Sequence, residues 1–181
     1  MKKEWSIVDV LRHSRHDWLN KIQLIKGNVA LHKYDRVKEI IDEIVMETQN
    51  ESRLTNLHLD QLSTYIMTFN WEPHRFMIEY EVIGGAGDLS SYDDNLLAWC
   101  ESLFNLLDST IDLLGENQLS ITIEILKEEV RFFFDFRGII KDRDILLKWF
   151  EEKQQEPIIL LTEYSVHYEE ITASINVKLP N

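Results

Sequence analysis

The chain has 181 residues, 44% of them apolar or aromatic, which is enough to bury the core of one domain or of two small ones. Its 19 basic and 32 acidic residues give a formal net charge of -13, which argues against general nucleic-acid binding, because neutralising phosphates needs clustered cations. No apolar stretch approaches the ~18 residues of a membrane span, and Asp9 and Arg12 interrupt any signal-peptide core, so we expect a soluble, cytoplasmic protein.

The charge is distributed unevenly along the chain. Residues 1–80 hold 11 basic and 12 acidic residues, a net of -1, whereas residues 81–181 hold 8 and 20, a net of -12, and the two sum to -13. This asymmetry predicts two parts with different surfaces, of which the nearly neutral first part is the better candidate for docking an acidic partner.

The first part reads as a helical hairpin. Residues 6–31 contain no proline and a single glycine, and a seam recurs at alternating spacings of four and three: Leu11, Arg15, Trp18, Ile22, Ile25 and Val29. The pattern breaks at residues 32–34, and Asp35 is the predicted N-cap of a second helix that carries Val37, Ile41 and Ile44 on one face.

Two helices alone would leave one side of this apolar seam in water, so another surface must cover it. A second copy of the hairpin would do so by forming a four-helix bundle, and we therefore expect a homodimer. The alternative is that the hairpin packs on the C-terminal part of its own chain.

The second part alternates strands and helices. The pattern predicts helices near residues 59–69, 92–114 and 142–150, and strands near residues 76–82, 119–126, 130–136, 158–163 and 171–179. The only cysteine, Cys100, lies in an apolar run and is interpreted as a buried thiol without chemistry.

Together these patterns predict an α+β protein of two domains. Residues 1–56 form the helical hairpin, which becomes a four-helix bundle by dimerisation, and residues 57–181 form an α/β sandwich with helices on one face of a largely antiparallel sheet.

The candidate chemistry lies on the first helix, around a histidine. His16 falls one position past the seam residue Arg15, so its ring is expected to face solvent. Asp17 follows directly, Asn20 lies one turn later on the same face, and Arg12 lies one turn earlier.

A neutral imidazole is a competent nitrogen nucleophile, and a neighbouring carboxylate can fix its tautomer. Phosphoryl transfer needs mostly positioning and charge stabilisation, so such a surface suffices if a partner supplies Mg²⁺ and its own aspartate. On the residues alone, however, a His-Asp pair on a helix is more often a solvated surface feature.

Resemblance to known families favours a phosphoacceptor over a solvated surface histidine. Residues 16–27 look like the phosphoacceptor hairpin of citrate-sensor-type histidine kinases, and the run His-Ser-Arg-His-Asp-Trp at residues 13–18 resembles the signature of the sporulation initiation phosphotransferase B family. The resemblance extends over the whole chain, including residues 68–71 and 80–82.

The resemblance implies roles for individual residues. His16 matches the phosphoacceptor, and Arg15, Asp17 and Asn20 match its surroundings. His13 matches a second family histidine, for which a solvated surface position is the favoured interpretation.

The C-terminal part resembles the ATP-binding domain of histidine kinases in a degenerate form. Ser109 stands where the kinase helix motif has its Mg²⁺-binding Asn, and Arg137 and Ile139 stand at two glycine positions of the kinase Asp-x-Gly-x-Gly motif. No glycine lies beyond Gly138, so no glycine-rich loop remains to hold phosphates. For Glu101 and Asn105 an exposed helix face is the favoured interpretation.

The resemblance therefore implies a histidine phosphotransferase of a sporulation phosphorelay. It would take a phosphoryl group from the aspartate of one response regulator onto His16 and pass it to the aspartate of a second, without ATP. We expect response-regulator receiver domains as partners, no cofactor bound by this chain, and Mg²⁺ on the partner.

Two other functions remain open. A histidine autokinase that has lost its sensor would bind ATP near Asn105 and Asp135, and the broken glycine pattern argues against it. A non-enzymatic dimeric adaptor would bind response regulators without needing His16.

Overall fold

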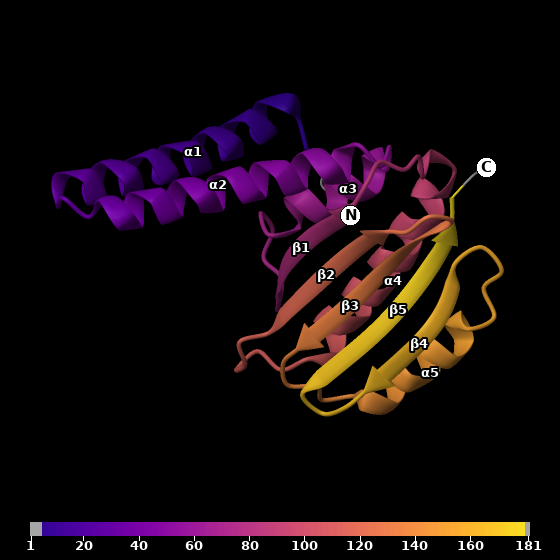
Figure 1. Cartoon of the computed structure of the whole chain (residues 1–181). Coiled ribbons are helices and arrows are strands. Elements are labelled where there is room, and N and C mark those ends of the chain that lie inside the picture. The colour runs from indigo at the N-terminus through magenta and orange to yellow at the C-terminus, as the bar shows by residue number, and fades with distance from the viewer. Residues whose placement is uncertain (1–4, 180–181) are drawn as a thin grey trace. The chain divides into compact units, whose positions relative to one another are not determined.

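The computed structural model describes residues 5–179, and the chain divides into two compact units between Gln49 and Asn50. The first unit is the predicted hairpin. Its helices α1 (Ile7–Ala30) and α2 (Tyr34–Thr55) run side by side in opposite directions (Figure 1), and α2 continues into the second unit.

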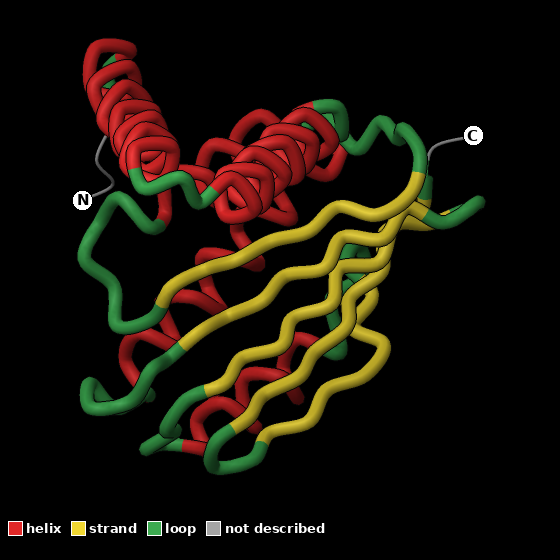
Figure 2. The backbone as a smooth tube through the Cα atoms, turned by 60° about the vertical axis from the view of Figure 1, so that its left-hand side comes forward, coloured by secondary structure: helices red, strands yellow, loops and turns green. Residues whose placement is uncertain are grey.

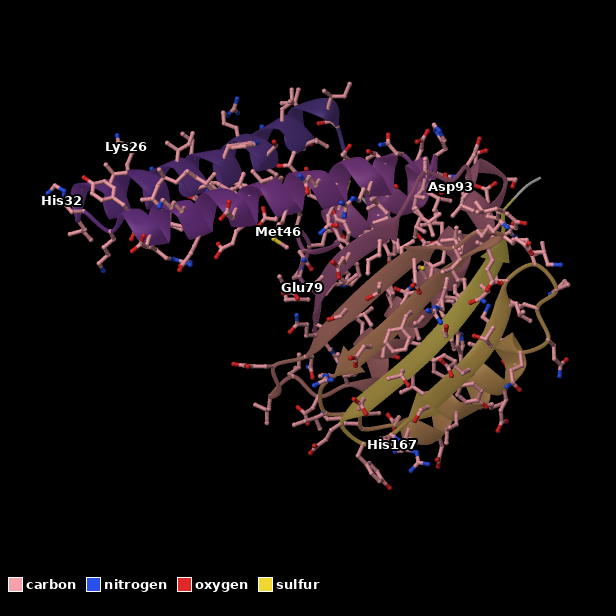
Figure 3. The ribbon with its side chains drawn as sticks, in the orientation of Figure 1. Lys26, His32, Met46, Glu79, Asp93 and His167 are labelled. Carbon is pink, nitrogen blue, oxygen red and sulfur yellow. The ribbon has the colours of Figure 1, made fainter. Side chains whose placement is uncertain are left out.

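Local side-chain chemistry sets the ends of the two helices. Ser6 caps α1, because its hydroxyl oxygen accepts a hydrogen bond from the Asp9 backbone N–H at 3.2 Å. The chain reverses through His32, which has a left-handed φ of 53° and lies at the hairpin turn (Figure 3).

The prediction that Asp35 is the N-cap of the second helix is wrong. Helix α2 begins one residue earlier, at Tyr34, and the Val37 N–H already bonds to the Lys33 carbonyl at 3.1 Å. Asp35 instead lies in the first turn, where its carboxylate favourably faces the partial positive charge of the helix N-terminus.

The apolar seam of α1 is open to solvent in the single chain. Helix α1 has no buried residue. The exposed fractions of the seam are large: Leu11 59%, Trp18 50%, Ile22 47% and Val29 43%. The two helices are joined by an ion pair between Lys21 and Glu47, and α2 adds further exposed apolar side chains such as Met46 (Figure 3).

The second unit is an α/β layer structure with a five-stranded sheet. Its elements are α3 (Asp60–Phe69), β1 (Met77–Gly84), the short 3₁₀ helix η1 (Ser90–Tyr92), α4 (Asp93–Thr110), β2 (Gln118–Ile125), β3 (Glu129–Arg137), α5 (Arg143–Lys153), β4 (Leu160–Val166) and β5 (Glu170–Lys178). The strand order is β1-β2-β3-β5-β4, with β1 and β2 parallel and every other neighbouring pair antiparallel.

The helices of this unit lie on one face of the sheet (Figure 2), as the alternating pattern predicted. In β3, every second side chain is buried under them: Val130, Phe132, Phe134 and Phe136. The intervening residues of β3 point to the other face and are half-buried or exposed. The α+β fold class is thereby confirmed.

Helix α4 ends four residues earlier than its apolar pattern predicts. Ile111 leaves the helix in an extended conformation and forms an antiparallel bridge with Ile140, and the Asp112 N–H bonds to the Ile139 carbonyl at 2.8 Å. Leu113 and Leu114 therefore lie in an exposed loop. Long-range backbone pairing overrides the local helical pattern here.

Polar side chains cover part of the free edge of β1. Asn70 accepts from the Ile78 N–H at 2.9 Å and donates to the Ile78 carbonyl at 2.8 Å. At Val82, the N–H is 3.4 Å from the Asn50 side-chain oxygen and the carbonyl accepts from Arg53 at 3.1 Å. These contacts satisfy backbone groups that an edge strand would otherwise offer to another chain.

Candidate functional site around His16

His16 lies in the middle of α1 with its ring open to solvent. The side chain is 74% exposed, and the adjacent side chain of Asp17 is 54% exposed. The predicted accessibility of the ring is therefore present in the single chain.

One ring nitrogen of His16 faces two polar neighbours. Nδ1 lies 3.2 Å from the Asn20 side-chain amide nitrogen and 3.6 Å from an Asp17 carboxylate oxygen. Asn20 sits four residues later, one helical turn along, which is why its amide reaches the ring. Both polar contacts of the ring within residues 5–179 are at Nδ1, so Nε2 has no protein hydrogen-bond partner there.

The two contacts at Nδ1 correspond to different protonation states. If Nδ1 is unprotonated, it accepts from the Asn20 amide; if it carries the proton, it can donate to the Asp17 carboxylate or to the Asn20 oxygen after rotation of the amide. In the second state Nε2 keeps a free lone pair. In that state Nε2 can act as the nucleophile while Asp17 or Asn20 binds the proton on Nδ1.

The structure brings three of the four predicted site residues together and leaves the fourth apart. Arg15 is exposed, and its guanidinium makes no ion pair with any residue between 5 and 179. Arg12, one turn before His16, directs its guanidinium to Asp9 at 2.8 Å rather than to the imidazole. Neither guanidinium therefore contacts the imidazole.

His13 and Trp18, the other notable residues of the motif, make different contacts. His13 is half-buried, and its ring lies edge-on to Trp5 with ring centroids 5.1 Å apart, so the expected solvated surface position is only partly open to solvent. Trp18 lies in the open seam, with the Lys21 ammonium 6.0 Å from its ring centroid.

Comparison with known proteins assigns the family. A model described as the sensor kinase SpoOB-type alpha-helical domain matches residues 1–57, and one described as the C-terminal part of sporulation initiation phosphotransferase B matches residues 58–178. Sporulation initiation phosphotransferase B of Bacillus subtilis (strain 168) is 42% identical over 138 residues, which cover 75% of this chain and 72% of that protein.

This chain belongs to the sporulation initiation phosphotransferase B family. The family resemblance predicted from residues 13–18 is confirmed. The two family models meet between residues 57 and 58, and the two compact units meet between Gln49 and Asn50. The predicted domain boundary, between residues 56 and 57, lies between these two positions.

Among solved structures, similar chains include two histidine kinases. The Acinetobacter baumannii kinase AdeS is 12% identical with a TM-score of 0.42, covering 92% of this chain and 98% of the other. A blue-light activated kinase of Erythrobacter litoralis is 11% identical with a TM-score of 0.46, covering 99% and 62%. A bacterial phosphotransferase is 14% identical with a TM-score of 0.39, covering 96% and 98%.

In this family member the kinase-like motif positions of the second unit make internal contacts. The Ser109 hydroxyl donates to the Leu106 carbonyl at 2.7 Å, so it is engaged by its own helix. A Cβ at Gly138 would lie 2.2 Å from the Asn117 side-chain oxygen. Gly138 therefore makes room for Asn117 and is not part of a glycine-rich loop. Ser109 thus bonds within its own helix, and the missing side chain of Gly138 leaves space for Asn117.

Asp135 and Asn105, the positions at which an autokinase would bind nucleotide, do not form a joint site. One Asp135 oxygen lies 3.5 Å from Arg137, and the other is buried without a hydrogen-bond partner in the described chain. Asn105 is exposed on α4. Among residues 5–179 no three His, Cys, Asp or Glu side chains are arranged to hold a metal ion.

Sequence reasoning missed a second histidine-carboxylate pair. His74 Nδ1 lies 2.6 Å from Asp108 on α4, and the ring stacks on Phe69 with centroids 3.7 Å apart. The other Asp108 oxygen accepts from the Arg75 N–H at 2.8 Å. The partners are 34 residues apart in the chain, so no local pattern could have indicated the pair. Half-buried and stacked, it ties a loop to α4.

No helix within residues 5–179 combines the length and apolar character that crossing a membrane requires.

Proposed function

We propose that this family member is a histidine phosphotransferase whose His16 carries a phosphoryl group between the aspartates of two response regulators. The single observation that carries the proposal is a 74% exposed imidazole whose Nδ1 faces Asn20 and Asp17 and whose Nε2 has no hydrogen-bond partner within residues 5–179. Membership of a family of phosphotransferases supports the same chemistry.

The proposed reaction has two steps. The Nε2 lone pair attacks the phosphorus of an aspartyl phosphate, the P–O bond to that carboxylate breaks, and the carboxylate leaves with the electron pair. In the second step a carboxylate of another regulator attacks the same phosphorus, and the N–P bond breaks to restore the imidazole. Each transfer needs an in-line approach, which an exposed ring permits.

Each residue of the site has a proposed role in these steps. Asp17, and Asn20 once its amide is rotated to present the oxygen, would accept from Nδ1–H, which keeps the proton on that nitrogen and the lone pair on Nε2. Arg15 offers a cation to the phosphoryl oxygens. Mg²⁺ is expected to come with the partner receiver domain, and this chain supplies no cofactor.

We further propose that the working form is a homodimer in which two hairpins make a four-helix bundle. The support is the open seam: α1 has no buried residue, and Leu11, Trp18 and Ile22 are each about half exposed or more. Isolated apolar residues are normal on a surface, but an apolar stripe that recurs along a helix from Leu11 to Val29 is typical of an interface.

The deciding experiment follows the label from a phosphorylated single-domain response regulator, with Mg²⁺ and without ATP. Wild type is expected to take up acid-labile label and pass it to a second regulator, His16→Ala to take up none, and His13→Ala, a matched change three residues away, to keep transfer.

Two other outcomes would overturn the proposal. Label that appears only when ATP is added would favour an autokinase. Regulator binding that is unchanged in His16→Ala, with no label on wild type under either condition, would favour an adaptor.

A further inference from the structure

Gly27 is a glycine inside helix α1 that the packing of its own chain does not require. A contrasting case is Gly84, where φ is 109° and an added Cβ would lie 2.6 Å from the Ile125 carbonyl oxygen. At Gly27 φ is not positive, and an added Cβ would meet no atom within 4 Å. The Gly27 carbonyl accepts from the Leu31 N–H at 3.1 Å, so the helix continues through this residue without a break.

A glycine at this position costs the helix stability. Glycine loses more backbone freedom on folding than any other residue, so alanine is the more stable choice inside a helix. The open space around Gly27 would accept the methyl group of an alanine. What glycine offers instead is a bare stretch of helix backbone that another surface can approach closely. This residue is therefore a candidate for a contact with another molecule.

Gly27 lies on the same face of α1 as His16. Eleven residues separate them, which is about three helical turns and about 16 Å along the helix axis. The apolar seam faces another way, because Val29 follows Gly27 by two residues and is therefore about 160° away around the helix. A second hairpin that covers the seam would leave Gly27 on the outer surface, beside the face that carries His16.

The surroundings of Gly27 are apolar and basic. Leu24 and Leu31, one turn to either side, are 51% and 65% exposed, and neither belongs to the seam. Residues 18–34 contain three lysines and no acidic residue, although the whole chain has a net charge of -13. Two of these lysines, Lys26 (Figure 3) and Lys33, are exposed. This surface suits a partner that offers an apolar side chain and an acidic exterior.

We propose that Gly27 receives an apolar side chain of the response-regulator receiver domain, with Leu24 and Leu31 on either side, and so helps to select the partner. The inference rests on the proposed phosphotransfer at His16. A standard interface takes about 800 Å² on each partner, a patch about 30 Å across, so a receiver centred on His16 extends to the turn that holds Gly27. The carboxylates with which a receiver holds Mg²⁺ make its docking face acidic, which suits the lysines.

The inference predicts opposite effects of one substitution on folding and on transfer. Gly27→Ala should raise the midpoint of thermal unfolding, because alanine favours the helix. The same change should raise the KM for a phosphorylated receiver by about two- to fivefold, and Gly27→Leu should raise it by about tenfold or more, because added bulk disturbs a packed contact. The kcat should stay within about twofold, because the substitutions leave His16 and its neighbours unchanged.

Three controls accompany these measurements. Gly85→Leu makes the same change at a glycine of the second unit with equally open surroundings, and it should leave KM unchanged. Phosphoramidate, which gives its phosphoryl group to an imidazole and releases ammonia, is too small to cover Gly27, so it should label the wild type and Gly27→Leu at equal rates. Light scattering should give both proteins the same mass, because Gly27 faces away from the seam.

Each possible failure has a distinct meaning. An unchanged KM in Gly27→Leu, with a receiver that labels the wild type, would remove the proposed contact and leave the phosphotransfer intact. A changed mass in Gly27→Leu would mean that a second copy of the chain covers this residue. Slower labelling of Gly27→Leu by phosphoramidate would mean that the substitution disturbs His16 itself. A wild type that takes label from phosphoramidate but from no receiver would contradict the phosphotransfer and this inference together.

Discussion

The His74–Asp108 and His16–Asp17 pairs combine the same residue types in different environments. His74 is 21% exposed, stacked on Phe69 and held at 2.6 Å by Asp108, so its ring is fixed in the structure. His16 is 74% exposed and lies 3.6 Å from Asp17. A phosphoryl carrier needs a ring that a partner can reach and whose second nitrogen is oriented without being held tightly. The exposed ring of His16, with Nδ1 near Asp17, meets both requirements.

The loose contact between His16 and Asp17 leads to a first prediction. Asp17→Asn should slow phosphoryl transfer to His16 by about tenfold or more, because an amide orients the Nδ1 proton less well than a carboxylate. The rate of label transfer from a phosphorylated receiver domain measures the effect. Asp42→Asn, an exposed carboxylate on α2, should leave the rate unchanged. Equal rates in the two variants would remove the proposed role of Asp17.

Cys100 is a second case in which environment decides chemistry. Burial raises the pKa of its thiol, and the nearby charge of Glu101 raises it further. The thiolate, which is the reactive form, is therefore scarce at neutral pH. The sequence predicted this from the apolar run around the residue, and the structure confirms the burial.

The reactivity of Cys100 can be checked directly. The native protein should react with an aromatic disulfide reagent at pH 8 at least about a hundredfold more slowly than the same chain in guanidinium chloride, because both access and thiolate formation are suppressed. The release of the coloured thiolate gives both rates. Fast reaction of the native protein would mean that α4 opens locally or that the thiol is accessible.

At the scale of elements, the sequence predicted the strands and helices whose apolar residues recur at a regular spacing. The five strands and five α-helices that the structure describes in residues 5–179 were all found from apolar patterns of period two or 3.6 residues. The errors are at element ends. Helix α2 starts at Tyr34 and is not capped by Asp35, and α4 stops at Thr110 because the following backbone pairs with the segment at Ile139 and Ile140. The short η1 helix carried no pattern long enough to predict.

Asp93 shows how one side chain can organise two helices. It lies at the first residue of α4 (Figure 3), yet its two oxygens accept from the Gln61 and Leu62 backbone N–H groups at 2.9 and 3.0 Å, in the first turn of α3. Asp93 is 9% exposed. It thus caps a helix from 31 residues away, which sequence patterns of local capping do not reveal.

Removing this cap should be costly. Asp93→Ala is expected to lower the free energy of unfolding by about 1–3 kcal/mol, because the buried Leu62 N–H and the partly buried Gln61 N–H lose their acceptor. Asp94→Ala removes an exposed neighbour that bonds only to the Gln61 side chain and should cost a few tenths of a kcal/mol at most. Urea unfolding of both variants makes the comparison, and similar losses would contradict the assigned role.

At the scale of the whole molecule, the two units differ in whether each buries a hydrophobic core of its own. The second unit has its own core, built from the sheet and α3, α4 and α5. The hairpin of the first unit buries Ile40 and no residue of α1. The sequence predicted the open seam from its spacing, and it predicted His16 beside that seam. It could not predict the pair of His74 and Asp108, which lie 34 positions apart in the chain.

The open seam leads to the last prediction, on assembly. Wild type should have twice the 21.5 kDa mass of one chain in light scattering at micromolar concentration. Ile22→Glu should give monomers, because each copy loses about 1.5–3 kcal/mol of apolar burial and places a charge in the proposed interface. Gln23→Glu makes the same charge one position away on the helix and should leave the dimer intact.

Label transfer in the monomeric variant then separates two uses of the bundle. Phosphorylation of His16 in an Ile22→Glu monomer would mean that one exposed helix is enough for the chemistry and that dimerisation serves stability. Loss of transfer in a monomer that stays helical by circular dichroism would mean that the receiver domain contacts both copies. A wild-type monomer, or an Ile22→Glu variant that still dimerises, would contradict the proposed interface.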